Sequence, residues 1–484
     1  QEGMLFHCLY QPDVDLYLVQ ITCELLGDLD PTLFRQAWQQ VARRNPALRT
    51  AYRWQDLEAP LQVVRSRVKV PVAVVDWRPL SDSARKEALT RYLEEDRQRG
   101  FDLSRAPLLR FLLARKDEQS WVMVATLHQS MVDGWSLPEL FQEFTAFYGA
   151  AGGELPELPP RRPYRDYIAW LEKQDRAAAE AYWRQRLAGF TEPTPLIEDG
   201  TANAEGEEAG EGAHGEGHHT LERGVTEALE GLARRHRVTP NVLVQGAWGL
   251  LLGRYAERRD VVFGVTVSGR PVELEGVEQM IGLFINTLPL RVQLPRGTSV
   301  GPWLKGLMDA QLELQKFEYS ALPDVQRWSE VPAGQSLFES FLVFQNEPLD
   351  ISRAVDAEVL TVGSDEDLSE ERSHYALNLV AYPGERLSFS LEFDGRRHSP
   401  STIDRMLHHL GNLLAGMTAV RDGGGEVRIE EISLLSPTER HQLAVEWNGP
   451  ALQVPVAETL HQVFTRQARS TPEAGALTFE GETL

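Results

Sequence analysis

Cysteine is almost absent from this sequence of 484 residues. Only Cys8 and Cys23 are present, so at most one disulfide can form. Small secreted domains that depend on disulfides are far richer in cysteine. The composition therefore predicts a protein kept in a reducing compartment, and we expect a cytoplasmic location.

Long apolar runs are missing as well. No stretch approaches the roughly 20 apolar residues of a membrane-spanning helix, and no basic-then-apolar leader opens the chain. We therefore expect no membrane partner. The sequence begins at Gln1 and stops within an apparent strand at 475–484, so we expect both ends to be internal to a longer polypeptide.

Positive charge is in short supply. The 49 lysines and arginines stand against 71 aspartates and glutamates, which gives a formal net charge of -22. Proteins that bind nucleic acid need a basic surface for the phosphate backbone. We therefore expect no nucleic-acid partner, and partners that tolerate or complement an acidic exterior.

What is present is an alternation of strand and helix patterns that runs through the chain twice. A single hydrophobic core rarely grows beyond about 250–300 residues, so the length predicts two lobes. The fold class is therefore predicted as α/β with paired lobes, at 1–180 and 181–435. Expected helices are 31–44, 81–98, 136–148, 164–187, 242–255, 300–318, 401–417 and 459–470, and the expected strands include 17–25, 121–127, 260–267, 285–292, 375–382 and 387–393.

Residues 199–219 interrupt this alternation. They are rich in Gly, Ala and Glu and contain almost no large apolar side chain, so we expect a flexible acidic loop. His214, His218 and His219 lie in it. Because no cysteine or carboxylate geometry surrounds them, a solvated loop is favoured over a metal site.

The segment 121–148 is the best candidate for a site. Trp121–Leu127 is a continuous apolar run typical of a strand buried on both faces, and a turn and a helix follow it. Ligands of α/β proteins bind beyond the carboxyl ends of strands, where His128, Gln129 and Asp133 would lie. Gly134 would allow a sharp turn or a close approach to a ligand, and Ser136 would cap the helix.

These residues carry a family resemblance. His128–Ser136 (HQSMVDGWS) resembles the His-His-x-x-x-Asp-Gly-Trp-Ser signature of nonribosomal peptide synthetase condensation domains. Further motifs of that family are matched in order by QEGMLFH from Gln1, RNPALRTAY from Arg44, YRDYIAW from Tyr164 and IGLFINTLPLR from Ile281, and more loosely by 317–320 and 341–346. The resemblance covers about residues 1–435, and residues 436–484 resemble a linker and the start of an adenylation domain.

The resemblance implies a fold and a reaction. Two chloramphenicol acetyltransferase-like lobes would form a V-shaped pseudo-dimer, with the active site in a tunnel between them. Upstream donor and downstream acceptor peptidyl carrier proteins would supply thioesters on phosphopantetheine arms, and the domain itself, a monomer, would bind no cofactor or metal. The acceptor amine would attack the donor thioester. The opening motif and DGWSLPEL resemble the subclass that takes a D-configured donor residue.

One catalytic position departs from the family pattern. The second histidine of the signature is the catalytic one, and it corresponds to Gln129, four residues before Asp133. His128 is out of that register, and neighbouring side chains at a strand end point to opposite faces, so we interpret it as a buried, hydrogen-bonded histidine. A glutamine amide cannot accept a proton. We therefore predict an inactive or strongly impaired acyltransferase.

The remaining site assignments also follow from the resemblance. Asp133 would have a structural role through an ion pair with an arginine, with Arg270 as first choice and Arg44 or Arg49 as alternatives. Trp135, Ser136 and Asn286 would line the tunnel, although Trp135 could instead pack in the core.

Two alternatives stay open. An epimerisation domain shares the signature but would not be expected directly before an adenylation domain. A cyclisation domain is excluded, because it would need aspartates at both histidine positions and the sequence has His128 and Gln129 there. A non-catalytic module that docks carrier proteins or recruits an enzyme is favoured by Gln129 alone. The sequence does not distinguish a natural glutamine from one introduced deliberately.

Overall fold

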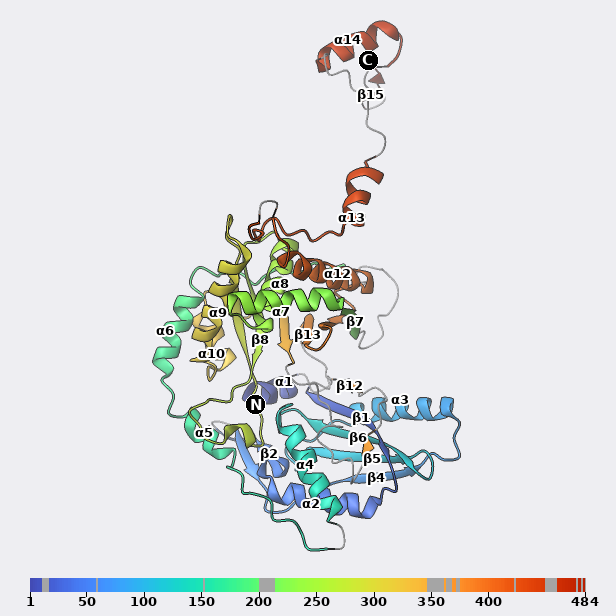
Figure 1. Cartoon of the computed structure of the whole chain (residues 1–484), viewed down its shortest axis with the longest axis vertical. Helices are drawn as coiled ribbons and strands as arrows, with labels where there is room; N and C mark the ends of the chain where they lie inside the picture. The colour runs from blue at the N-terminus through green and yellow to red at the C-terminus, as the bar shows by residue number, and fades with distance from the viewer. Residues whose placement is uncertain are drawn as a thin grey trace. The chain divides into compact units, whose positions relative to one another are not determined.

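The structure is a computed structural model of the chain. It describes residues 1–10, 17–57, 60–150, 153–199, 214–345, 361–362, 368–370, 375–421, 424–448, 459–475, 478–479 and 482–483. The chain divides into two compact units, Gln1–Leu434 and Leu435–Leu484. The first unit contains the candidate site (Figure 1).

The first lobe is built on a sheet whose central strands are antiparallel. The strand order is β11-β1-β6-β5-β4, with β12 also paired to β1. The strands are β1 (Leu18–Leu26), β4 (Val72–Asp76), β5 (Leu109–Arg115), β6 (Ser120–His128), β11 (Thr361–Val362) and β12 (Leu368–Glu370). The expected buried strand at 121–127 is therefore β6, which lies between β1 and β5 and is buried along most of its length.

Helices cover this sheet through aromatic packing. α2 (Pro31–Arg44) begins where the sequence predicts, because the Asp30 side chain accepts hydrogen bonds from the Thr32 and Leu33 amides and Pro31 occupies the first turn. Phe34 and Trp38 of α2 contact Phe111 of β5 and Phe144 of α4 (Ser136–Gly149). The other elements of this lobe are α1 (Glu2–Tyr10), η1 (Pro46–Arg49), β2 (Thr50–Arg53), β3 (Leu61–Val64) and α3 (Asp82–Arg99).

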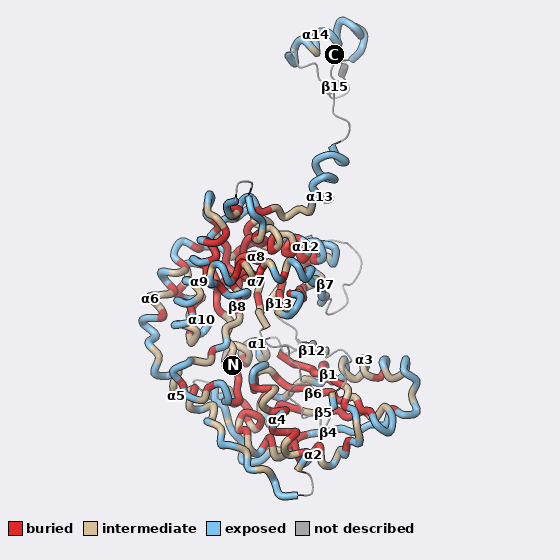
Figure 2. Tube along the Cα trace, in the orientation of Figure 1, coloured by how far each residue is buried: buried red, intermediate tan, exposed pale blue. Residues whose placement is uncertain are grey.

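The second lobe has its own six-stranded sheet, in the order β7-β14-β13-β10-β8-β9. Figure 2 shows the helix α8 (Pro240–Tyr255) as buried, whereas the edge strand β7 is mostly exposed. α8 is apolar on all sides and buried over most of its length, as expected of a helix with no solvent face. The strands are β7 (His214–Thr220), β8 (Asp260–Val267), β9 (Asn286–Gln293), β10 (Ser340–Phe344), β13 (Leu377–Tyr382) and β14 (Ser388–Asp394). The helices are α7 (Arg223–His236), α8 (Pro240–Tyr255), α9 (Val300–Gln315), α10 (Leu322–Trp328), α12 (Pro400–Met417) and the short η3 (Val277–Gln279).

Two short strands from late in the chain join the sheet of the first lobe. β11 and β12 follow β10 in the sequence, yet both pair antiparallel with β1 of the first lobe. The predicted boundary at residue 180 would place β11 and β12 in the second lobe, but both strands belong to the sheet of the first lobe. β1 has one edge on β6 and its other edge open to these short strands, and backbone groups at a sheet edge pair with whatever extended segment reaches them.

Several predicted elements differ from those observed. The expected helix at 164–187 is two helices, α5 (Arg165–Leu171) and α6 (Arg176–Arg186), because the Asp175 side chain caps a new start by accepting from the Ala178 amide. The expected helix at 300–318 ends at Gln315. The motif predicted at 341–346 includes Asn346, which lies outside the described residues.

The loop expected at 199–219 is wrong at its C-terminal end. His214–Thr220 forms β7, paired with β14 at the edge of the sheet, so His214, His218 and His219 lie in a strand and not in a loop. Gly217 suits this position, because a Cβ there would lie 2.8 Å from Cγ2 of Ile403. Residues 200–213 lie outside the described residues. Within the described residues no three His, Cys, Asp or Glu side chains form a group that could hold a metal ion.

The second unit is small. It contains α13 (Pro437–His441), η4 (Gln442–Glu446), α14 (Leu460–Ser470) and the paired strands β15 (Thr478–Phe479) and β16 (Glu482–Thr483). α14 begins one residue later than predicted, and Thr459 caps it in a reciprocal capping box with Gln462. Among all the helices that the structure describes, none is long and apolar enough to cross a membrane.

Candidate functional site

The candidate motif lies at the carboxyl end of β6 and runs into α4, as the sequence predicts. β6 ends at His128, and α4 begins at Ser136. The seven residues between them form the turn in which Gln129 and Asp133 lie. A single turn therefore places all the motif residues at one end of the first sheet.

His128 is buried. Its side chain is enclosed by Tyr17 and Phe101, whose rings lie 6.4 Å and 6.5 Å from the imidazole centre. The imidazole Nδ1 lies 2.7 Å from Ser130 Oγ, and Nε2 lies 3.7 Å from Cys8 Sγ. Burial lowers the pKa of His128 to about 4. The ring is therefore neutral at pH 7 and occupied by neighbouring protein groups, which agrees with its interpretation as a buried histidine.

Gln129 lies in a different environment from its neighbour. The residue is only partly buried, and its backbone amide donates a hydrogen bond of 2.8 Å to the Tyr17 carbonyl. This bond fixes the main chain where the strand ends. The side-chain amide can donate and accept hydrogen bonds but offers no base for a proton.

Asp133 is fully engaged with protein groups. Its Oδ1 accepts from Arg270 Nη2 at 2.9 Å and from the Ser136 backbone amide at 3.0 Å, and its Oδ2 accepts from the Phe284 amide at 3.1 Å. Its own backbone amide donates to the Gly282 carbonyl. Asp133 therefore ties the turn after β6 to residues 282–284, which lead into β9 of the second lobe.

Arg270 is the partner that the sequence favours, and its ion pair with Asp133 is almost completely buried. The guanidinium also donates to the Val277 and Met280 carbonyls and lies 4.1 Å from the centre of the Phe284 ring. These bonds hold the Arg270 side chain in place between Asp133 and residues 277–280, so its contacts are those of a residue that stabilises the fold. Buried ion pairs are tolerated only when further hydrogen bonds satisfy their polar groups. Here both Asp133 oxygens and both terminal nitrogens of Arg270 are bonded, whereas Arg270 Nε is buried without a partner among the described residues.

The two alternative arginines have other partners. Arg44 pairs with the buried carboxylate of Glu143 at 2.6 Å. Arg49 donates to the backbone carbonyls of Ala42 and Arg65. Neither is a partner of Asp133.

The role expected for Ser136 at the start of α4 is wrong. Its side chain makes no capping bond to a helix amide. Instead the Ser136 hydroxyl is buried and donates a hydrogen bond to Asp133 Oδ1 at 2.8 Å. The same oxygen also accepts a hydrogen bond from the Ser136 backbone amide. The physical reason is that Asp133 lies three residues earlier, and its carboxylate is a stronger acceptor than a hydroxyl.

Gly134 and Trp135 are both exposed, and the roles predicted for them toward a ligand or a tunnel stay predictions. Gly134 is exposed, its φ is not in the left-handed region, and a Cβ there would have no heavy atom within 4 Å. The fold of this chain therefore does not require glycine at that position. Trp135 is 46% exposed, which is inconsistent with the alternative of core packing.

Asn286 supports a neighbouring turn. Its side-chain amide donates to the Glu318 and Ser320 carbonyls at 2.8 Å and 2.7 Å, so both its N–H groups hold the segment after α9. Its place in a tunnel stays a prediction.

Two further residues near this site, Glu318 and Tyr164, are not among those that the sequence predicts. Burial raises the pKa of the Glu318 carboxyl to about 7, although it accepts a hydrogen bond from the Gly269 amide next to Arg270. The Tyr164 hydroxyl donates to the Leu283 carbonyl beside the residues that bind Asp133. Both lie in segments that match family motifs, and that match was the available signal.

Comparison with known proteins places this geometry in a family. A family profile described as "Condensation domain" matches residues 1–444. A linear gramicidin synthase of Brevibacillus parabrevis is 40% identical over 482 residues, which are 99% of this chain and 6% of the relative. Surfactin synthase subunit 3 of Bacillus subtilis (strain 168) is 32% identical over 487 residues, which are 100% of this chain and 37% of the relative. The chain thus spans only a small part of the gramicidin synthases that it matches.

Solved structures show the same fold. The X-domain from teicoplanin biosynthesis matches with a TM-score of 0.76 and 21% identity, covering 90% of this chain and 96% of that one. The first condensation domain of the calcium-dependent antibiotic synthetase, in complex with a substrate analogue, matches with a TM-score of 0.69 and 18% identity, covering 90% and 98%. The predicted α/β fold with two chloramphenicol acetyltransferase-like lobes is thereby confirmed. This chain belongs to the condensation-domain family.

Proposed function

We propose that this chain serves peptide-bond formation in nonribosomal peptide synthesis, and that Gln129 leaves it a strongly impaired catalyst. The donor would be an acyl or peptidyl thioester and the acceptor an aminoacyl thioester, each on the phosphopantetheine arm of a carrier protein. In the reaction the acceptor nitrogen bonds to the donor carbonyl carbon, the carbon–sulfur bond breaks, and the thiol leaves with a proton. The ammonium proton of the acceptor must be removed for this attack.

One observation carries the proposal. Gln129 occupies the catalytic register while the scaffold around it, the buried Asp133–Arg270 ion pair, is complete. General-base catalysis typically contributes about 10²–10⁴-fold. A free α-amino group has a pKa near 8, so part of the acceptor is neutral at pH 7 and slow turnover is expected without a base.

Two finer proposals rest on the resemblance. The opening QEGMLFH and the DGWSLPEL segment support a donor that ends in a D-configured residue. Residues 436–484 support a linker followed by an adenylation domain, and the gramicidin synthase matches extend through this region.

The test is a condensation assay with loaded donor and acceptor carrier proteins on this chain and on Q129H. We expect Q129H to be about 10²–10⁴-fold faster. The matched control is Q142H, which makes the same change at an exposed position of α4 and should leave the rate unchanged. Equal rates for this chain and Q129H would contradict the proposed impairment.

A second candidate is a non-catalytic module that docks carrier proteins or recruits an enzyme. Gln129 favours it, and the teicoplanin X-domain, a protein of the same fold, has been solved in complex with OxyB. This candidate predicts carrier-protein binding by both Q129H and this chain, and product from neither.

A further inference from the structure

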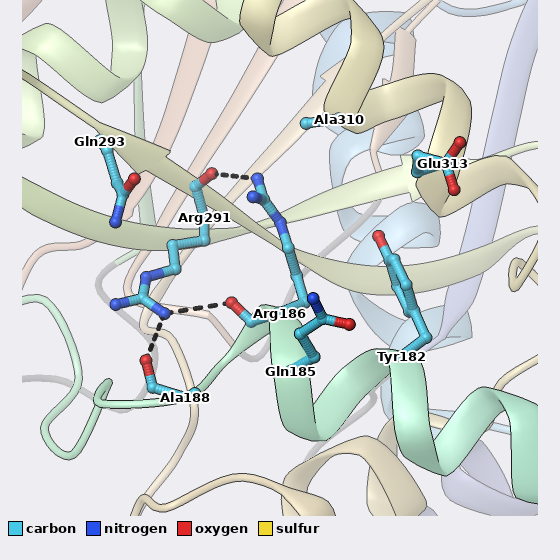
Figure 3. A pocket seen from close by; sticks show the side chains of 8 residues that line it. All are labelled: Tyr182, Gln185, Arg186, Ala188, Arg291, Gln293, Ala310 and Glu313. Atoms are coloured by element: carbon cyan, nitrogen blue, oxygen red, sulfur yellow. Dashed lines mark hydrogen bonds between the residues drawn. The ribbon is translucent and has the colours of Figure 1, made fainter.

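A cavity of about 530 Å³ lies on the second lobe, apart from the candidate site (Figure 3). Its wall is formed by α6, β9 and α9, and its polar side chains are Tyr182, Gln185, Arg186, Arg291, Gln293 and Glu313. None of these is a residue of the candidate site. The volume lies within the roughly 300–1,000 Å³ of small-molecule sites.

Arg186 is the unusual side chain in this cavity. Its Nη2 donates to the Arg291 carbonyl at 2.8 Å. Within the described part of the chain, no carboxylate lies within ion-pair distance of it. Burial lowers the pKa of the Arg186 guanidinium. A partly buried cation without a directly paired carboxylate is costly, so a group that supplies the missing acceptors would be bound favourably.

Arg291 of β9, which is hydrogen-bonded to Arg186, provides the contrast (Figure 3). Its guanidinium forms a two-point pair with Asp260 at 2.6 Å and 2.8 Å and also donates to the Arg186 and Ala188 carbonyls. Its charge is compensated by Asp260, and four of its five N–H donors are bonded. Arg186 is therefore the cation in this cavity that is available to a ligand.

One polar side chain of the cavity makes no hydrogen bond with the described residues. The Tyr182 hydroxyl is buried and makes no hydrogen bond with the described residues. Figure 3 shows Tyr182, Gln185 and Arg186 extending from α6 into the space that β9 and α9 enclose. A hydroxyl, an amide and a guanidinium thus line one wall.

Glu313 limits what can bind. Its carboxylate lines the α9 side of the cavity and pairs with Lys316 at 2.7 Å. A ligand with negative charge along its whole length would be repelled there. A ligand with one anionic end and a neutral or cationic remainder fits both walls.

We propose that this cavity binds a small organic molecule through a single oxyanion, a carboxylate or a phosphate, held by Arg186. The guanidinium fork matches the geometry of either group, since both present paired oxygens. The Tyr182 hydroxyl and the Gln185 and Gln293 amides would bond the uncharged part of the ligand.

The test is calorimetric titration of the full chain with inorganic phosphate and, separately, with acetate, at ionic strength held constant with sodium chloride. We expect saturable binding of one equivalent of at least one probe, and the preferred probe identifies the oxyanion. R186Q should bind at least about tenfold more weakly, the loss expected for a charge-assisted hydrogen bond. The matched control R184Q removes an exposed arginine of the same helix and should bind as the unchanged chain does.

Unfolding in phosphate-free buffer gives an independent readout. Because R186Q removes a partly buried charge that has no directly paired carboxylate, we expect its thermal midpoint to equal or exceed that of the unchanged chain. A clearly lower midpoint would make Arg186 a structural residue and overturn the proposal. Equal binding by R186Q, an equal loss in R184Q, or no binding of either probe to the unchanged chain would also overturn it.

Discussion

At the scale of single residues, His128 and Gln129 are neighbours with opposite environments. His128 is buried among aromatic rings and bonded to Ser130, whereas Gln129 is partly exposed at the turn. The alternation of side chains along a strand explains the difference. A one-residue displacement therefore separates the buried histidine from the position at which we propose that the catalytic base is missing.

The burial of His128 predicts a pH effect on stability. The unfolded chain takes up a proton near pH 6.5, but the folded chain does so only near pH 4. Between these values the unfolded state binds more protons, so His128 makes folding less favourable as the pH falls from 6.5 to 4. The free energy of unfolding should therefore fall between pH 7 and pH 4 by on the order of 3 kcal/mol less in H128Q than in the unchanged chain. Denaturant unfolding at the two pH values measures this difference.

The control for this effect is H461Q, which replaces an exposed histidine of α14. It should show the pH dependence of the unchanged chain. Parallel curves for H128Q and the unchanged chain would show that His128 is accessible to protons in the folded state.

At the scale of elements, the sequence predicts a helix or strand correctly when the residues that cause it are close together in the chain. α2 begins where predicted because Asp30 caps it within three residues, and β6 is identified by its apolar run. β7 was missed, since HGEGHHT has neither an apolar run nor alternation and becomes a strand only through pairing with β14. The sequence of β7 allows an extended conformation but does not predict one, and pairing with β14 stabilises it.

The packing of β7 can be tested with an alanine. G217A would place a Cβ 2.8 Å from Ile403 and 3.1 Å from Leu407 of α12, so we expect a loss of about 1–3 kcal/mol in the free energy of unfolding. G224A on α7 meets no atom within 4 Å and should stabilise by about 0.5–1 kcal/mol. Chemical denaturation measures both. If G217A were neutral, residues 214–220 would not pack on α12 as observed.

At the scale of the whole molecule, the chain consists of a large unit and a small one. The described residues of α13, η4 and α14 include no buried side chain. By contrast, Leu434 packs on the core of the large unit, and its carbonyl accepts from the Asn412 side chain. The large unit thus keeps its own core contacts up to its last residue.

This division predicts the result of truncation. A chain that ends at Leu434 should unfold at the same temperature as the full chain to within about 2 °C, because the hydrophobic clusters of the described residues all lie at or before Leu434. Differential scanning calorimetry on both chains measures this. A chain that ends at Met417 is the matched control, and it should be clearly less stable because it loses the buried Ile429 and Ile432. A large loss in the Leu434 chain would show that the second unit contributes to the core.

The sequence alone determined the family motifs, the apolar strand β6, the cap of α2 and the register that singles out Gln129, because each depends on residues close together in the chain. Only the tertiary structure decided that Arg270, 137 residues away, completes Asp133, that β11 and β12 pair with β1, and that Arg186 faces a cavity without a paired carboxylate among the described residues. These features arise from burial and pairing between distant segments. Such contacts leave no periodic or spacing signal in either segment. The family resemblance offered Arg270, Arg44 and Arg49 as partners, and only the folded chain shows which of the three binds Asp133.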